Sequence, residues 1–396
     1  MKGWLFAFGL LFMLAVEVLS VYFIMPFPGS QEANTIDIAY FIHKNIWLLR
    51  LIGFLIVVIP FFHILKYSRL WKKILMLCSL VVYCAVAYAF NFKFLADKMF
   101  YQPRNKLLLE AASDTTHRNK LVIGVAINGE AKAYPIEIIG YHHQVRDTVG
   151  GEQVMVTYCT VCRTGRAFSP YINGKLQSFR LVGMDHFNAM FEDSATHSWW
   201  RQENGVAIAG PLTGSMLKEI PSSQMALSDW LKLHPNSYVL QPDHAFLKQY
   251  AGLKGYDEDT LKSSLEKRDS ASWRMKSWIV GVDLNNHAKA YDWNELAKNR
   301  VIQDSLAGVP LLFTLQPGER TFYVFDRQTT NGVLHFTFDM TTESLRDAQT
   351  NSTWNVDGNC VEGAMKGYHL KIIQAYQEFW HSWKAFHPNT LTYPAK

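Results

Sequence analysis

The chain has 396 residues, a formal net charge of +5 and five cysteines. This modest charge, without a basic run interleaved with aromatic residues outside one short loop, excludes nucleic acid as an expected partner. So few cysteines in a chain of this length exclude a disulfide-stapled scaffold. After an apolar N-terminal region, the remaining ~300 residues are long enough for one large domain or two ordinary ones.

Three apolar runs fill the first part of the chain: Trp4–Met25, Ile46–Leu65 and Ile74–Phe92. Each is about long enough to cross a hydrocarbon core of ~30 Å, and aromatic residues gather at their ends. Buried helices of a soluble domain are the alternative, which three successive runs without a polar face disfavour. The first run lacks an A-x-A-like cleavage site, so we interpret it as a retained helix and not a signal peptide. Glu17 lies within it and marks a candidate helix–helix contact. We predict a three-helix membrane anchor over residues 1–95.

The loops between these runs predict the orientation. The second loop carries four cations, Lys66, Arg69, Lys72 and Lys73, whereas the first carries mainly Lys44 with two carboxylates. Because basic loops stay in the cytoplasm, we expect the N-terminus inside and the chain after about residue 95 outside. In a bacterium this is a multi-pass protein of the plasma (inner) membrane with an extracytoplasmic soluble region. The expected partners are the lipid bilayer and a membrane protein.

The soluble region contains one unit twice. Val122–Tyr158 aligns without a gap on Ile279–Leu315, and Ala-Lys-Ala-Tyr occurs at 131–134 and again at 288–291. Later words also recur in order, among them Ser198-Trp-Trp200 and Ser352-Thr-Trp354. The period is far longer than that of solenoid repeats. We therefore predict a first repeat over 96–242, a connector over 243–276 and a second, degenerate repeat over 277–396.

The local patterns of each copy indicate short strands joined by tight turns. Asn128-Gly129 and Asn173-Gly174, between β-rich runs, predict hairpins. Pro135–Tyr141 and Ser228–His234 predict short helices, the second capped by Ser228 and stopped at Pro235. The predicted class is α+β: three transmembrane helices followed by a mostly antiparallel, β-rich duplicated region.

The sharpest chemical signal is Cys159-x-x-Cys162. Two thiols at this spacing bind one metal ion or close a redox disulfide, provided that the chain turns between them. The second copy has Gln316 and Glu319 at these places, and Asn299 where the first has His142. This shared absence suggests that His142, Cys159 and Cys162 form one site. A structural disulfide or two buried thiols is the alternative, and for His142 the alternative is an isolated histidine.

Met190 is a further candidate ligand in the first copy. Thioether, imidazole and thiolate ligands together suit copper in an oxidising compartment, although a methionine in an apolar stretch is more often part of the core. Residues that both copies share, such as Trp230 and Trp383, are interpreted as architecture. Cys78, Cys84 and Cys360 are interpreted as apolar packing residues.

The chain resembles a family catalogued as a domain of unknown function, number 3179. The resemblance rests on four sequence motifs: Ala133-Tyr-Pro135, His142-x-x-Val-x-Asp147, Val156-Thr-Tyr-Cys-x-x-Cys162 and Ser198-Trp-Trp-x-Gln202. It covers about Leu121–Pro242, with a diverged second match over the rest. The family usually has Pro-Leu between the cysteines, where this chain has Thr160-Val161. The resemblance implies the fold unit and the cysteine pair, and it implies no established activity.

Three functions follow from the residues. The leading hypothesis is a membrane-anchored protein that binds a soft metal ion, copper in preference to zinc, in metal handling or electron transfer. Cys159, Cys162 and His142 are its predicted ligands, with Met190 as a weak fourth. The second hypothesis is a thiol–disulfide oxidoreductase that uses the same cysteines, with Cys159 attacking if it is the more exposed. The third is a non-catalytic membrane assembly or binding module. No nucleotide cofactor is indicated, and the sequence leaves open whether the chain is an enzyme.

Overall fold

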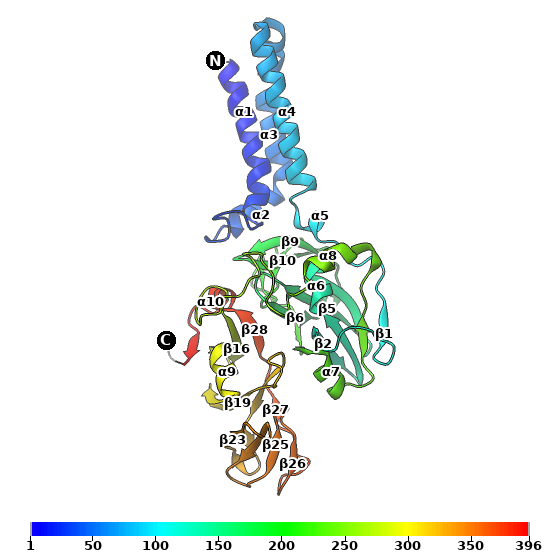
Figure 1. Cartoon of the computed structure of the whole chain (residues 1–396). Helices are drawn as coiled ribbons and strands as arrows, with labels where there is room; N and C mark the ends of the chain where they lie inside the picture. Colours follow the sequence, from blue (N-terminus) through cyan, green and yellow to red (C-terminus); the bar gives the residue numbers. More distant parts are fainter. Residues whose placement is uncertain (1, 395–396) are drawn as a thin grey trace. The chain divides into compact units, whose positions relative to one another are not determined.

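The computed structural model describes residues 2–394. By internal contacts the chain divides into two compact units. The first joins Met1–Tyr101 with Pro170–Leu217, and the second joins Gln102–Ser169 with Lys218–Lys396. The predicted boundaries follow the sequence repeat, whereas this division places part of the first repeat with the apolar helices. Figure 1 colours the elements of both units along the chain.

The first unit contains three long apolar helices, α1 (Lys2–Tyr22), α3 (Ile46–Tyr67) and α4 (Leu70–Phe92), which run side by side (Figure 1). At about 1.5 Å per residue, each spans about 30–35 Å, close to the thickness of a hydrocarbon core. Many of their large apolar side chains are exposed, as lipid-facing side chains are. The structure confirms three segments that are long and apolar enough to cross a membrane.

Glu17 is buried among these helices. Arg50 of α3 donates to both of its carboxylate oxygens at 2.9 and 2.7 Å, and the Asn91 amide of α4 donates at 2.7 Å. The predicted helix–helix contact at Glu17 is therefore an ion pair with α3 and a hydrogen bond with α4, which together link three helices. Pairing is what a carboxylate in an apolar helix requires.

The rest of the first unit is a small sheet in the order β12-β11-β10-β9, with the hairpin β7–β8. Helix α2 (Ile36–Lys44) contacts this sheet: the Tyr40 hydroxyl donates to the His197 carbonyl at 3.2 Å, and His43 Nε2 lies 3.2 Å from a Glu192 oxygen. The other elements are α5 (Ala96–Met99), β7 (Tyr171–Ile172), β8 (Lys175–Leu176), β9 (Phe179–Asp185), β10 (Asn188–Asp193), β11 (Trp199–Arg201) and β12 (Ala207–Ala209).

In the second unit, the first copy builds two sheets, β1-β15-β3-β2-β14 and β13-β6-β5-β4. Helices α6 (Ile136–His142) and α7 (Leu227–Leu233) lie close to the predicted ranges. The predicted cap is wrong: α7 begins after Ala226, without a side-chain cap. The strands are β1 (Leu108–Glu110), β2 (Leu121–Ile127), β3 (Glu130–Pro135), β4 (Gln144–Val149), β5 (Glu152–Cys159), β6 (Thr164–Phe168), β13 (Glu219–Ile220), β14 (Ser223–Ala226) and β15 (Tyr238–Leu240). The connector contains η1 (His244–Phe246) and α8 (Leu247–Gly252).

The second copy repeats the element order, so that β2 to β15 have counterparts in β16 to β29. Its sheets are β28-β16-β17-β29, β18-β19-β20-β27 and β23-β24-β25-β26. Its elements are β16 (Trp278–Leu284), β17 (His287–Asp292), α9 (Trp293–Asn299), β18 (Val301–Leu306), β19 (Val309–Leu315), β20 (Phe322–Asp326), β21 (Gln328–Thr329), β22 (Gly332–Val333), β23 (Phe336–Asp339), β24 (Ser344–Asp347), β25 (Thr353–Asn355), β26 (Cys360–Glu362), β27 (Lys371–Ile372), β28 (Tyr376–Phe379), α10 (Trp380–Phe386) and β29 (Leu391–Tyr393). Most strand pairs are antiparallel, as predicted, and the parallel pairs β3–β15 and β17–β29 are counterparts.

Equivalent residues make equivalent contacts in the two copies. The Tyr134 hydroxyl donates to Asp147 at 2.9 Å, and the Tyr291 hydroxyl donates to Asp304 at the same distance. A methyl group added to Gly124 would overlap the Trp230 ring, and one added to Gly281 would overlap Trp383. Because these shared tryptophans are buried against backbone, they belong to the architecture of each copy.

Within the second unit the two copies share an interface. The Gln224 amide donates to the equivalent residue of the other copy, Gln377, at 2.8 Å. One buried cluster contains Trp230 of the first copy together with Leu312 and Trp354 of the second. The copies therefore share part of their core, and they also meet at the turn that holds the cysteines.

Candidate functional site

The two cysteines lie at a tight turn between two strands. Cys159 is the last residue of β5 and pairs with Thr164, the first residue of β6. Residues 160–163 form the turn, and Arg163 has a left-handed backbone with φ 57°. This is the turn that a common site requires, and the Cys159 and Cys162 side chains are hydrogen-bonded to each other. No disulfide joins the two in the structure.

Both thiols are shielded from solvent, with exposed fractions of 0%. Burial raises the pKa of the Cys162 thiol well above its usual value, and the hydrogen bond with Cys159 raises it further. The nearby Lys276 ammonium acts in the opposite direction. Exposure therefore does not single out Cys159 as the attacking thiol, and the Cys162 thiol is protonated at neutral pH.

The turn is covered by the connector and the second copy. Three consecutive carbonyl oxygens of the turn accept hydrogen bonds from outside the first-copy sheet. These bonds run from the Tyr256 hydroxyl to Thr160 at 2.9 Å, from Lys276 Nζ to Val161 at 2.6 Å, and from the Phe379 amide to Cys162 at 2.9 Å. Arg163 also crosses the interface, because its Nε donates to Gln377 at 2.9 Å and its guanidinium lies 3.9 Å from the centre of the Trp278 ring.

Lys276 provides a positive charge at the site, and its ammonium is hydrogen-bonded to His381. Lys276 Nζ lies 3.1 Å from His381 Nε2. Burial lowers the pKa of His381 to about 3, and the Lys276 charge adds to this effect. The imidazole is therefore neutral and accepts from the ammonium. Burial also lowers the pKa of Lys276, whereas ionisation of Cys162 or Cys159 opposes that change. A thiolate formed here is balanced by one positive charge.

In the structure His142 contacts Tyr250 and Phe246. It is buried at the end of α6, where Nε2 lies 2.6 Å from the Tyr250 hydroxyl and the ring packs edge-on against Phe246. Met190 is buried on β10 of the first unit. Among residues 2–394, no three His, Cys, Asp or Glu side chains lie close enough to hold a metal ion together. Of the four predicted ligands, the structure thus brings together the two thiols, and the larger set stays a prediction.

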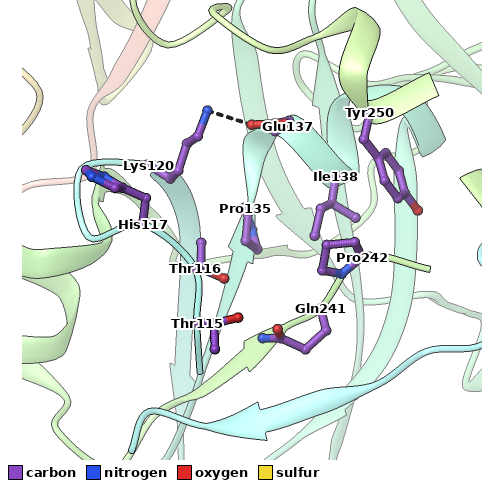
Figure 2. A pocket seen from close by; sticks show the side chains of 10 residues that line it. All are labelled: Thr115, Thr116, His117, Lys120, Pro135, Glu137, Ile138, Gln241, Pro242 and Tyr250. Carbon is purple, nitrogen blue, oxygen red and sulfur yellow. Dashed lines mark ion pairs between the residues drawn. The ribbon is translucent and has the colours of Figure 1, made fainter. Parts of the chain in front are cut away.

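Tyr250, the hydrogen-bond partner of His142, lines a pocket (Figure 2). This pocket has a volume of about 200 Å³ and lies beside the start of α6. Tyr250 lines it, as do Lys120 and Glu137, which form an ion pair at 2.6 Å. Neither cysteine is among the residues that line it. The pocket and the dithiol are therefore separate features of the second unit.

The equivalent turn of the second copy carries different chemistry. Glu319 pairs with Arg300 at 2.8 Å, and Asn299 donates to Glu295 at 2.6 Å. Where Lys276 donates to the first-copy turn, the aligned position is Asn119, whose carbonyl accepts from Arg320 at 3.2 Å. The thiols and the lysine ammonium are thus both absent from the second of two related turns, whose cations are arginines.

Sequence reasoning missed Lys276 and His381. The repeat alignment contains a signal for both, because Lys276 aligns with Asn119 and His381 with Ser228. The cysteines stand out as residues that the second copy lacks. Lys276, just before the first strand of the second copy, and His381, at the start of its last helix, stand out as residues that the second copy has gained.

The fold and the site define a duplicated β-rich protein with three candidate membrane spans and one shielded dithiol. A family model described as protein of unknown function (DUF3179) matches residues 102–390, so the chain belongs to this family, as the sequence resemblance predicted. No curated protein and no solved structure gives a significant match.

Proposed function

We propose that the chain is a membrane-anchored dithiol–disulfide protein in which Cys159 and Cys162 are oxidised and reduced as a pair. The observation that carries this proposal is the pair of buried cysteines on one tight turn, whose Val161 carbonyl accepts a hydrogen bond from the Lys276 ammonium at 2.6 Å. The thiols, the lysine ammonium and the imidazole occur at only one of the two related turns, so the repeated fold does not account for them. The basic loop at 66–73 supports an extracytoplasmic location, where disulfides persist.

The chemistry is a two-electron exchange. One thiolate attacks an oxidised sulfur or oxygen, and the second thiol then displaces the group bound to the first sulfur, which leaves a Cys159–Cys162 disulfide; the two electrons and two protons pass to the oxidant, which leaves as two thiols or as two molecules of water or alcohol. Lys276 favours the thiolate that begins the reaction. A purely structural role is less well supported, because closing so short a loop is worth only about 2 kcal/mol in the chain-entropy description.

A second function is favoured by the charge of the site. Two thiolates that bind Cu(I) carry one net negative charge, which the Lys276 ammonium balances, and soft thiolate ligands select Cu(I). Zinc prefers four ligands, so a pair of thiols supports copper in preference to zinc. Metal handling by Cys159 and Cys162 is therefore the alternative proposal. His142 and Met190 are the predicted further ligands of this alternative.

Thiol titration of the purified full-length protein in detergent tests the main proposal. The chain has five cysteines, so the reduced form titrates as five thiols after denaturation and the oxidised form as three. We expect reversible passage between these states, and Cys159→Ser and Cys162→Ser should each abolish it. Cys360→Ser, at a buried thiol of the second copy, is the matched control and should retain it. If the folded protein stays reduced under every disulfide or peroxide, whereas it retains one Cu(I), the alternative replaces the redox proposal.

A further inference from the structure

The cover over the thiols restricts which oxidant reaches them. Resting on the proposed redox function, we propose that the physiological oxidant of Cys159 and Cys162 is a small peroxide and not the disulfide of a protein or of a glutathione-sized peptide. The site thus belongs to chemistry that consumes peroxide and delivers a disulfide to be reduced later.

The first step of the argument is burial. Exposed fractions are 0% for both cysteines, 4% for Thr160, 3% for Val161 and 2% for Arg163. Thiol–disulfide exchange needs the attacking sulfur to approach the partner sulfur directly, with the rest of the partner molecule outside. A turn that is buried along its whole length offers no such approach to a large disulfide.

The second step is that the turn is held from outside. Its three carbonyl hydrogen bonds come from Tyr256, Lys276 and the Phe379 amide. A large oxidant must wait until these bonds break together, which makes its reaction depend on a local opening equilibrium. A peroxide of two heavy atoms needs a far smaller displacement.

The third step is the chemical balance. A cysteine thiolate attacks one oxygen of hydrogen peroxide and breaks the O–O bond, which gives a sulfenic acid and hydroxide; the proton lost from the thiol converts this hydroxide to water. The second thiol attacks the sulfenic sulfur and expels its hydroxyl group as a second water. Both cysteine sulfurs are oxidised, and peroxide supplies the oxidising equivalents. The Lys276 ammonium lies where it balances the thiolate and the departing hydroxide.

Comparison of oxidants on one protein tests this inference. Thiol loss is followed in the reduced full-length chain with hydrogen peroxide and with oxidised glutathione, in mild detergent and after denaturation. Relative to the denatured chain, we expect the folded protein to react with oxidised glutathione at least about 100-fold more slowly, because this reaction requires local opening. Its reaction with hydrogen peroxide should be slowed less than about tenfold.

A relocated pair supplies the matched control. Gln316→Cys with Glu319→Cys, in a chain that also carries Cys159→Ser and Cys162→Ser, places two thiols on the aligned turn, where Glu319 is exposed. This pair should react with oxidised glutathione without protection by the fold. Equal slowing of both oxidants at the native pair would overturn the peroxide inference and leave the redox function intact. If neither oxidant yields a disulfide in the folded protein, the redox function itself fails.

Discussion

The turns at residues 160–163 and 317–320 are related by the repeat, and they differ in what surrounds them. The first is buried and holds two thiols, whereas Pro317, Gly318 and Glu319 are exposed. Both turns contact the other copy, yet only the first accepts a hydrogen bond from a lysine ammonium. A duplicated fold therefore provides two equivalent turns, and the one that holds the two thiols differs from the other on both sides of the interface.

The second copy contributes residues to the surroundings of the two thiols. From the sequence it is a degenerate repeat that has lost a site. In the structure it provides His381 and the Phe379 amide, and the connector before it provides Lys276. The second copy is thus the cover and part of the electrostatic environment of the site.

The shared architecture gives the largest expected effect on stability. Gly124→Ala and Gly281→Ala each place a methyl group against a buried tryptophan ring, Trp230 or Trp383. We expect each to lower the free energy of unfolding by about 3 kcal/mol, the upper range for overpacking, and by similar amounts in the two copies. Thermal unfolding in detergent measures this. Gly318→Ala, with open space around it, is the control. A large difference between the two substitutions would show that the copies are not equivalent in packing.

The next effect is a pH dependence that belongs to the second copy. His381 has a pKa of about 3 in the folded protein, below its usual value of about 6.5 in an unfolded chain. The neutral imidazole thus stabilises the fold above pH 6.5, and this contribution is lost as the pH falls toward 3. Partial solvent access of the side chain weakens this effect, so we expect the free energy of unfolding to fall by about 2 kcal/mol at pH 4.5.

His381→Gln isolates this dependence, because the variant shares every other titrating group with the wild-type chain. The difference in melting temperature between the two proteins should shrink or reverse from pH 7.5 to pH 4.5. His287→Gln, at an exposed hairpin of the same copy, should leave the difference constant. A parallel decline of wild type and His381→Gln would contradict the neutral assignment of this imidazole.

Lys276→Met changes the reactivity of the pair by a smaller amount. Lys276 lowers the pKa of Cys162, so its removal shifts thiolate formation to higher pH. Because the thiolate is the form that attacks, we expect peroxide oxidation at neutral pH to slow several-fold. The pH profile of the oxidation rate is the decisive measurement, because a merely structural role would not displace it. Lys289→Met, which removes an ion pair with Asp304 in the second copy, should leave the profile in place.

The extent to which the sequence predicted this molecule depends on how local each signal is. Apolar runs predicted the three long helices, and Asn128-Gly129 predicted the β2–β3 hairpin, because both signals lie within one segment. The need for a turn between Cys159 and Cys162 also followed from strand geometry alone. Lys276 and His381 are more than a hundred residues away in the chain, and their place at the turn depends on how two copies pack. His142 was assigned by shared absence, which identifies what changed between copies without showing that the changed residues touch.

The smallest effect lies at the turn that has no dithiol. Glu319 is the residue aligned with Cys162, and its ion pair with Arg300 joins side chains that are 47% and 21% exposed. Such a pair in solvent contributes less than about 0.5 kcal/mol, because water screens the charges and ordering two long side chains costs entropy. Glu319→Gln should therefore leave the melting temperature and the oxidation rate of the native pair unchanged, whereas Cys162→Ser abolishes disulfide formation. A marked effect of Glu319→Gln on oxidation would mean that the two turns communicate through the interface, and the second turn would then have to be counted as part of the site.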